Sequence, residues 1–346
     1  MVTLEQMRAS NARIATTLPP GLVAVFVGAT SGIGNTTLKQ FASRAQQPRI
    51  YFVGRRQAEG ERTQAELEKL NPDGGVPLHQ TGRQSIAKRR RGLPLYPKPR
   101  ICHQSTLPHL RVLDYQEALL WPIPETAEGL HYPMALMYYA RTRFILNLLP
   151  QLKKAPSLRR VVTVGASGKE GPIIPSDWQA NTLSILSFRP HAASMTTLSL
   201  LAVAKKEAPD VSFLHVYPGF VKTGMSRELT GLVPALARVL LAPAMALLQI
   251  PLDETGERQL YFATSARFPP GRSEDADGIM LGQGVGTATG ADGALGGGVY
   301  SIDYEGEGTG GNVRGVLDAL VKDGTADRLS EHTGEDFRRI TGSAAI

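Results

Sequence analysis

A strand-like run, three closely spaced glycines and a helix-like run follow one another near the start of the chain. Leu22-Val-Ala-Val-Phe-Val27 has the length and composition of a buried parallel strand, and residues 35–43 suit a helix. Gly28, Gly32 and Gly34 lie between them. Such a turn aims unpaired backbone N–H groups, at the positive end of a helix dipole, towards one point. A pyrophosphate fits there, and a tight turn without a ligand is the alternative.

A second apolar run follows within about thirty residues, as a βαβ unit requires. Pro48-Arg-Ile-Tyr-Phe-Val53 predicts a strand that is parallel to the first, and it ends in Gly54-Arg55-Arg56. The end of this strand is where such folds bind the adenosine ribose of a dinucleotide. An acidic residue there binds the 2′-hydroxyl, whereas an arginine accommodates a 2′-phosphate. Arg55 and Arg56 therefore favour NADP over NAD, unless one of them is simply a solvated surface charge.

The 346 residues are enough for one large α/β domain. We predict a Rossmann-like, doubly wound parallel sheet in a single domain over residues 1–346. Its predicted parts are a cofactor-binding βαβ unit (22–75), an irregular basic insert (76–124), the remaining sheet with the substrate cleft (125–270) and a C-terminal extension (271–346).

Composition limits the compartment and the partners. The single cysteine, Cys102, excludes an internal disulfide framework, and residues 1–20 lack the apolar core of a signal peptide, so we expect a cytoplasmic protein. Much of the net charge of +7 comes from residues 83–100, which show no nucleic-acid-binding motif, and no nucleic-acid partner is expected. Residues 229–250 are the most apolar stretch, but Arg238 and two prolines interrupt it. A broken amphipathic helix over a substrate cleft is favoured, with peripheral membrane contact as the alternative.

Residues 76–124 show no clear periodicity and are rich in proline and basic residues. A structureless stretch of this length inside a compact domain is unusual, and it is more often a linker or a disordered segment. The segments before and after this stretch show regular helix and strand patterns. Our hypothesis is that residues 79–120 come from a shifted reading frame, a retained intron or a faulty gene model, and sequencing of the transcript would decide it.

Two later strands bring polar residues to the same edge of the predicted sheet. Arg160-Val-Val-Thr-Val-Gly165 predicts a strand that leads to Ser167, and residues 211–216 predict another that leads into Tyr217-Pro-Gly-Phe-Val-Lys-Thr223. The carboxyl ends of parallel strands are where ligands bind in open α/β folds.

With these pieces placed, the chain resembles the short-chain dehydrogenase/reductase family over about 22–75 and 125–270. The run Gly28-Ala-Thr-Ser-Gly-Ile-Gly34 matches the cofactor turn of that family residue for residue. The run from Tyr217 to Thr223 looks like its Pro-Gly loop. The resemblance implies these cofactor-binding residues: Gly28, Thr30, Ser31, Gly32, Ile33, Gly34, Arg55, Arg56, Pro218, Gly219 and Thr223.

The resemblance also implies a catalytic serine, a tyrosine and a lysine four residues after that tyrosine. A nearby cation favours the phenolate, which lets the tyrosine act as an acid–base group near neutral pH. Ser167 takes the serine position, but no tyrosine occurs between Val161 and Val216. Aligning the helix places His191 at the tyrosine position and Met195 at the lysine position. His191 is either an atypical acid–base residue or a helix-start residue that makes a polar contact, and no metal site is expected.

The resemblance therefore implies an NADP-dependent oxidoreductase acting on a small carbonyl or alcohol, in the branch of the family found in fungal secondary-metabolite biosynthesis. Loss of the tyrosine–lysine pair leaves open a non-redox descendant, such as an isomerase or a cofactor-binding regulatory protein, or an inactive product of a faulty gene model. A small-molecule substrate is expected, and a homo-oligomer remains open.

Overall fold

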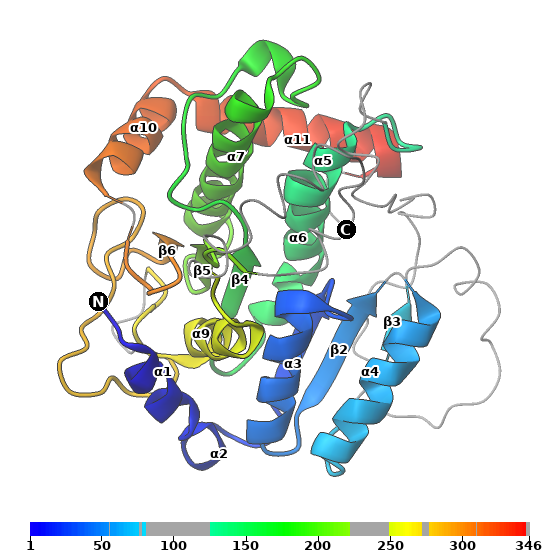
Figure 1. Ribbon diagram of the computed structural model, residues 1–346. Helices are drawn as coiled ribbons and strands as arrows, with labels where there is room; N and C mark the ends of the chain where they lie inside the picture. The colour runs from blue at the N-terminus through cyan, green and yellow to red at the C-terminus, as the bar shows by residue number, and fades with distance from the viewer. Residues whose placement is uncertain are drawn as a thin grey trace, which may run out of the picture. The chain divides into compact units, whose positions relative to one another are not determined.

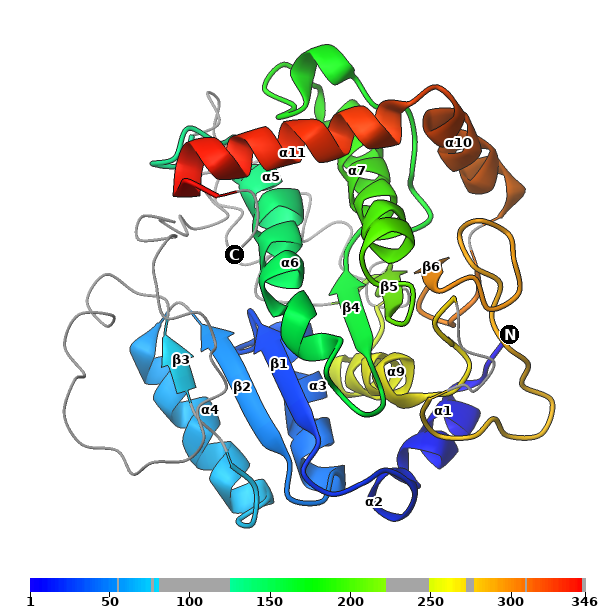
Figure 2. The ribbon, with the colours of Figure 1, turned by 180° about the vertical axis from the view of Figure 1, so that it is seen from behind.

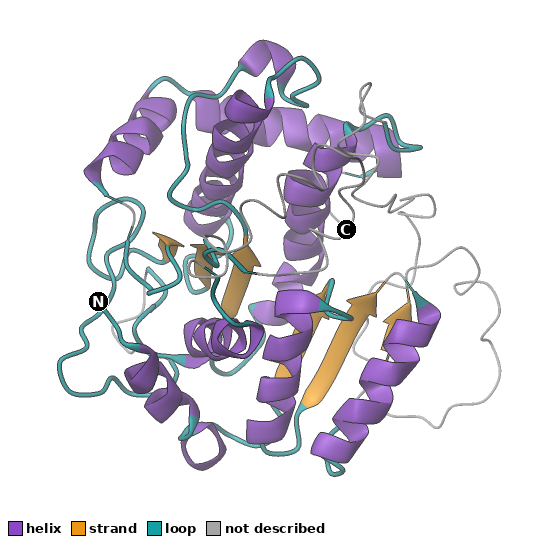
Figure 3. Ribbon diagram, in the orientation of Figure 1, coloured by secondary structure: helices purple, strands orange, loops and turns teal. Residues whose placement is uncertain are grey.

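The computed structural model describes residues 1–54, 56–75, 78–80, 125–221, 249–271, 277–308 and 310–343. The chain divides into two compact units. The N-terminal unit comprises Leu4–His103 and Phe220–Tyr261. The C-terminal unit comprises Met1–Thr3, Gln104–Gly219 and Phe262–Ile346. Each unit holds a three-stranded parallel sheet with helices, as Figure 3 shows by colour. Parallel sheets with flanking helices confirm the predicted fold class, whereas the single-domain organisation stays a prediction.

In the N-terminal unit the strand order is β1-β2-β3, and all three strands are parallel. Its elements are α1 (Leu4–Asn11), α2 (Ile14–Thr17), β1 (Val23–Val27), α3 (Gly32–Arg44), β2 (Arg49–Gly54), α4 (Gln57–Leu70) and β3 (Leu78–Gln80), with most of α9 (Leu252–Thr264). Helices α3 and α4 lie on one face of this sheet (Figures 1 and 2). Strand β3 lies at the start of the segment predicted to be irregular, 76–124, and residues 81–124 of that segment lie outside the described residues.

Burial of β1 also differs from the prediction. Phe26 packs towards the helical face, with its ring 6.0 Å from that of Phe41. On the opposite face Val23, Val25 and Val27 are 54%, 41% and 51% exposed. The run was expected to be buried on both faces because it is apolar throughout. In the part of the chain that the structure describes, only one face of β1 is covered.

In the C-terminal unit the strand order is β4-β5-β6, again parallel. Its elements are α5 (Tyr132–Met134), a π-helical turn (Ala135–Tyr139), α6 (Ala140–Leu152), β4 (Arg160–Val164), a 3₁₀ turn (Pro175–Asp177), α7 (Ile185–Lys206), β5 (Ser212–Val216), β6 (Val299–Ile302), α10 (Gly311–Lys322) and α11 (Thr325–Thr341). Helix α11 runs across α7 and α5–α6 in both views (Figures 1 and 2).

The core of this unit centres on the middle strand. All five residues of β5 are buried, and Phe213 packs in one apolar cluster with α7 and α11. Helix α7 begins at Ile185 because Ser184 caps it: the Ser187 N–H donates to the Ser184 hydroxyl at 3.3 Å. Both His191 and Met195 therefore lie on one continuous helix.

Candidate active site

The glycine turn has the geometry of an anion site. Gly28 and Gly32 have φ values of +77° and +60°, a region that side chains disfavour. A Cβ at Gly34 would lie 3.0 Å from the backbone of Ala29, so α3 can start this close to the turn only with glycine there. Ser31 precedes the first residue of α3 and makes no side-chain capping bond, which leaves the first N–H groups of the helix available. The residues fit a pyrophosphate.

Some of the other predicted cofactor-binding residues lie in the part of the chain that the structure describes, and others lie outside it. Thr30 packs against Gly54 at the end of β2, where a Cβ would collide with the threonine. The Ile33 carbonyl accepts a hydrogen bond from the Thr37 hydroxyl at 2.8 Å, inside α3. Arg56 is exposed at the start of α4. Arg55 and Thr223 lie outside the described residues.

At the end of β4, Ser167 belongs to a buried hydrogen-bond network (1% exposed). The Ser301 hydroxyl donates to Glu170 Oε1 at 2.5 Å, and the Ser167 and Ser301 hydroxyls are 2.8 Å apart. Because Ser301 has one proton and gives it to the carboxylate, Ser167 is the donor to Ser301. The only proton of Ser167 therefore points into the protein.

The other branch of the network runs through a histidine of β5. The Ala166 N–H donates to His215 Nε2 at 3.1 Å, so Nδ1 carries the proton and donates to the Thr197 hydroxyl at 2.9 Å. Thr197 donates in turn to Glu170 Oε1 at 2.8 Å. Burial lowers the pKa of His215, in agreement with a neutral ring. Burial acts to raise the pKa of Glu170, but the nearby His215 ring, with Nδ1 3.7 Å from Oε1, and the hydrogen bonds from Ser301 and Thr197 together hold it below its usual value.

His191 is fully buried, and both of its ring nitrogens bond to backbone. The Ile174 N–H donates to Nδ1 at 3.2 Å, so Nε2 carries the proton and donates to the Trp178 carbonyl at 3.1 Å. Burial lowers the pKa of His191. This geometry favours the polar-contact interpretation, and the acid–base role of His191 stays a prediction. Met195 is also fully buried, in the apolar core.

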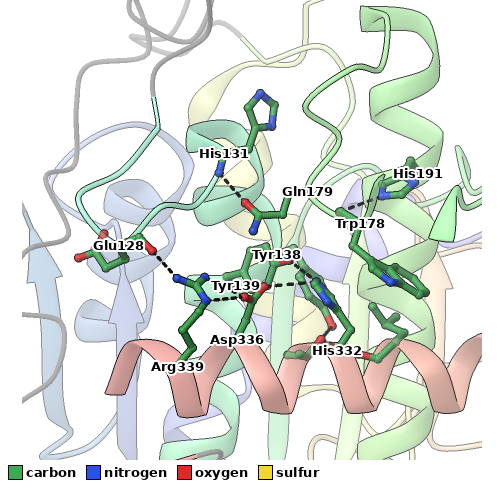
Figure 4. Close-up of polar contacts among 12 residues, drawn as sticks. Glu128, His131, Tyr138, Tyr139, Trp178, Gln179, His191, His332, Asp336 and Arg339 are labelled. Carbon is green, nitrogen blue, oxygen red and sulfur yellow. Dashed lines mark hydrogen bonds and ion pairs between the residues drawn. The ribbon is translucent and has the colours of Figure 1, made fainter. Parts of the chain in front are cut away.

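A second polar cluster holds the loop that His191 contacts (Figure 4). The Trp178 ring stacks on His332 of α11, with centroids 5.4 Å apart and the planes 16° from parallel. The Tyr139 hydroxyl is 2.8 Å from His332 Nε2. Arg339 donates to Asp336 at 2.8 Å and to the Glu128 carbonyl at 2.9 Å. Trp178, in the loop after β4, is thus attached to α7 through His191 and to α11 through His332.

Tyr217, the first residue of the predicted Pro-Gly loop, lies against two cationic side chains. It follows β5 directly, is partly exposed, and precedes Pro218 and Gly219, whose φ is +79°. Lys169 Nζ lies 6.0 Å and the Arg189 guanidinium carbon 5.4 Å from the centre of its ring. Tyr217 lies one residue beyond the interval from Val161 to Val216, in which no tyrosine occurs. Parallel pairing of Val164 with Val216 places the ends of β4 and β5 together, and this pairing could have signalled the contact.

Comparison with known proteins decides the family. No family model matches the chain. It is 35% identical to "Oxidoreductase AN1596" of Emericella nidulans, over 89% of this chain and 90% of that protein. It is 29% identical to "Short-chain dehydrogenase/reductase SAT2" of Stachybotrys chartarum, over 87% and 88% of the two chains. The chain belongs to the short-chain dehydrogenase/reductase family.

Among solved structures, the chain is similar to a short-chain dehydrogenase from Sphingobium yanoikuyae in complex with NADPH. The identity is 14% and the TM-score 0.40, with 69% of this chain and 83% of that chain covered.

The carboxyl edge of the C-terminal sheet encloses little open space among the described residues. A cavity of about 10 Å³ beside Gly165, Arg141 and His215 has room for one water molecule and is too small for a substrate. The described residues hold no cluster of three metal-ligating side chains. None of the helices within the described ranges is long and apolar enough to cross a membrane.

Proposed function

We propose that this short-chain dehydrogenase/reductase uses NADP to interconvert a small carbonyl compound and its alcohol. The observation that carries the proposal is the glycine turn, whose uncapped helix start has its first N–H groups available for a pyrophosphate. NADP supplies the hydride chemistry when bound. Arg55 and Arg56 would hold the 2′-phosphate, and Pro218, Gly219 and Thr223 would border the nicotinamide.

Within this proposal Ser167 and His191 position the loop after β4 rather than react. Ser167 gives its proton to Ser301, and His191 gives its proton to the Trp178 carbonyl. Neither proton is available to a carbonyl oxygen in this arrangement. The fungal origin of the relatives supports a place in fungal secondary metabolism, and the single Cys102 supports a cytoplasmic enzyme.

Thermal denaturation with and without NADPH tests cofactor binding. A bound cofactor raises the melting temperature according to RT ln(1 + [L]/Kd). Arg56→Ala should weaken NADPH binding by about tenfold, since hydrogen bonds to charged groups contribute about 1.5–3 kcal/mol, and should leave NADH binding unchanged. Gly75→Ala is the control, because a Cβ there meets only Arg49 Cγ at 3.8 Å. Absence of any shift with NADPH or NADP⁺ would refute the proposal.

The buried Met195 favours a second candidate function, a non-redox descendant that binds NADP. Methionine carries no charge, so it cannot stabilise a phenolate or bind the ribose hydroxyls as lysine does. A melting shift with NADPH, together with no NADPH oxidation over a panel of ketones and aldehydes, would select this candidate.

A further inference from the structure

Tyr217 stands at the carboxyl edge of the C-terminal sheet with a fixed backbone. Its N–H donates to the Ile302 carbonyl at 2.9 Å, which extends the β5–β6 pairing by one residue. Its side chain is partly exposed, in contrast to the fully buried strand that precedes it. A phenol in this position is held by the sheet and remains accessible.

Two cations from separate segments lie against this ring. Lys169 comes from the loop after β4, and Arg189 comes from the second turn of α7. Attraction between a cation and the ring face is worth about 0.5–1 kcal/mol at exposed sites, so two such contacts restrain the ring. Three segments that are distant in sequence therefore bring one phenol and two positive charges together.

Two other tyrosines of this unit, Tyr138 and Tyr300, are less suited to proton transfer. Burial raises the pKa of Tyr138 to about 12, and its hydroxyl bonds to Thr333 at 2.7 Å inside the core. Burial likewise raises the pKa of Tyr300, whose hydroxyl donates to the Pro269 carbonyl at 2.6 Å. These hydroxyls are committed to structural bonds.

We propose that Tyr217 is the acid–base residue of this enzyme, and that Lys169 and Arg189 stabilise the charge that develops on its oxygen. The inference rests on the proposed function. In the reducing direction the carbonyl carbon accepts a hydride from NADPH, and the pair of electrons of the C=O π bond moves to the oxygen. The Tyr217 O–H bond breaks, and its proton forms the new O–H bond of the alcohol. Solvent then returns a proton to the tyrosinate, and NADPH leaves as NADP⁺.

Lys169 and Arg189 contribute to this step through their positive charge. Negative charge grows on the phenol oxygen as its proton leaves, and positive charges held 5.4 and 6.0 Å from the centre of the same ring would stabilise that transition state. Lys169 and Arg189 thus supply the positive charge that Met195, at the position of the family's lysine, does not carry.

Tyr217→Phe keeps the ring and both cation contacts and removes only the hydroxyl. We expect kcat for NADPH-dependent reduction, over a panel of ketones and aldehydes, to fall by about 100-fold or more, the usual contribution of a general acid. The NADPH melting shift should persist. Tyr304→Phe is the matched control, another partly exposed tyrosine that follows a strand of the same sheet, and it should keep its activity. Lys169→Gln and Arg189→Gln should each lower kcat more than they raise KM.

A second measurement does not depend on turnover. N-acetylimidazole acetylates accessible tyrosine hydroxyls, and mass spectrometry locates the modified residue. We expect acetylation of Tyr217 that NADP⁺ slows and that Tyr217→Phe abolishes. Equal acetylation with and without NADP⁺, or full activity of Tyr217→Phe, would overturn the inference and leave the proposed function intact. Binding of NADPH without turnover by the wild type would overturn the inference and select the non-redox candidate. Absence of NADPH binding would overturn both.

Discussion

The two sheets of this protein are built alike and packed differently. Every residue of β5 is buried, whereas alternate residues of β1 are exposed. Both strands belong to parallel sheets, and each precedes a segment with a predicted cofactor-binding role. The geometry of the glycine turn is local to its own βαβ unit, because positive φ values at Gly28 and Gly32 and the start of α3 set it. The edge of the C-terminal sheet depends on contacts between β4, β5, β6 and α7.

Removing the carboxylate at the centre of the C-terminal network should have the largest effect. Glu170→Ala leaves the Ser301 and Thr197 hydroxyls without their buried acceptor, and each orphaned group costs about 1–3 kcal/mol. We expect the free energy of unfolding to fall by about 3 kcal/mol or more in chemical denaturation. Glu170→Gln keeps one acceptor oxygen and should lose less. Equal stability of the alanine variant and the wild type would show that this edge is no more tightly packed than β1.

A methyl group at Gly165 tests the packing of the same edge. Its Cβ would lie 2.5 Å from His215 Nε2, so the ring would have to move. Overpacking of this kind costs about 1–3 kcal/mol, which a lower melting temperature of Gly165→Ala would report. Gly282→Ala, with nothing within 4 Å of its Cβ, is the control and should change little. A loss of the same size in both variants would refute a specific clash with His215.

Acidification should destabilise the C-terminal unit through its buried histidines. Burial lowers the pKa of His131, His191, His215 and His332 below their unfolded value near 6.5. The unfolded chain therefore binds protons first as the pH falls. The contribution of the neutral histidines to the free energy of unfolding is complete above about pH 6.5. Below that pH the free energy of unfolding falls by about 1.4 kcal/mol per pH unit for each histidine that stays neutral in the folded protein. Melting temperatures measured from pH 7.5 to 5 check this, and a constant value would contradict it.

The exposed face of β1 should tolerate change best. Val25 is 41% exposed, so Val25→Thr should alter the free energy of unfolding by no more than about 0.5 kcal/mol. The matched substitution Val216→Thr places a hydroxyl in a fully buried strand and should cost about 1–3 kcal/mol. Chemical denaturation of both variants compares the sheets directly. A large loss for Val25→Thr would mean that this face is covered in the folded protein.

The sequence by itself determined the glycine turn, the parallel βαβ unit and the strands β4 and β5. These features depend on local periodicity and on backbone freedom at Gly28 and Gly32, so residues near one another in the chain carry them. It could not reveal that the described part of the chain covers only one face of β1, since an apolar run has the same composition whether or not a partner covers it.

Tertiary structure alone decided the chemistry at the sheet edge. The partners of His191, the inward proton of Ser167 and the two cations at Tyr217 come from segments far apart in the chain. A side chain's role there depends on which donors and acceptors surround it in space. Hydrogen bonds and charges act over a few ångströms, and only the folded chain brings these groups within that distance.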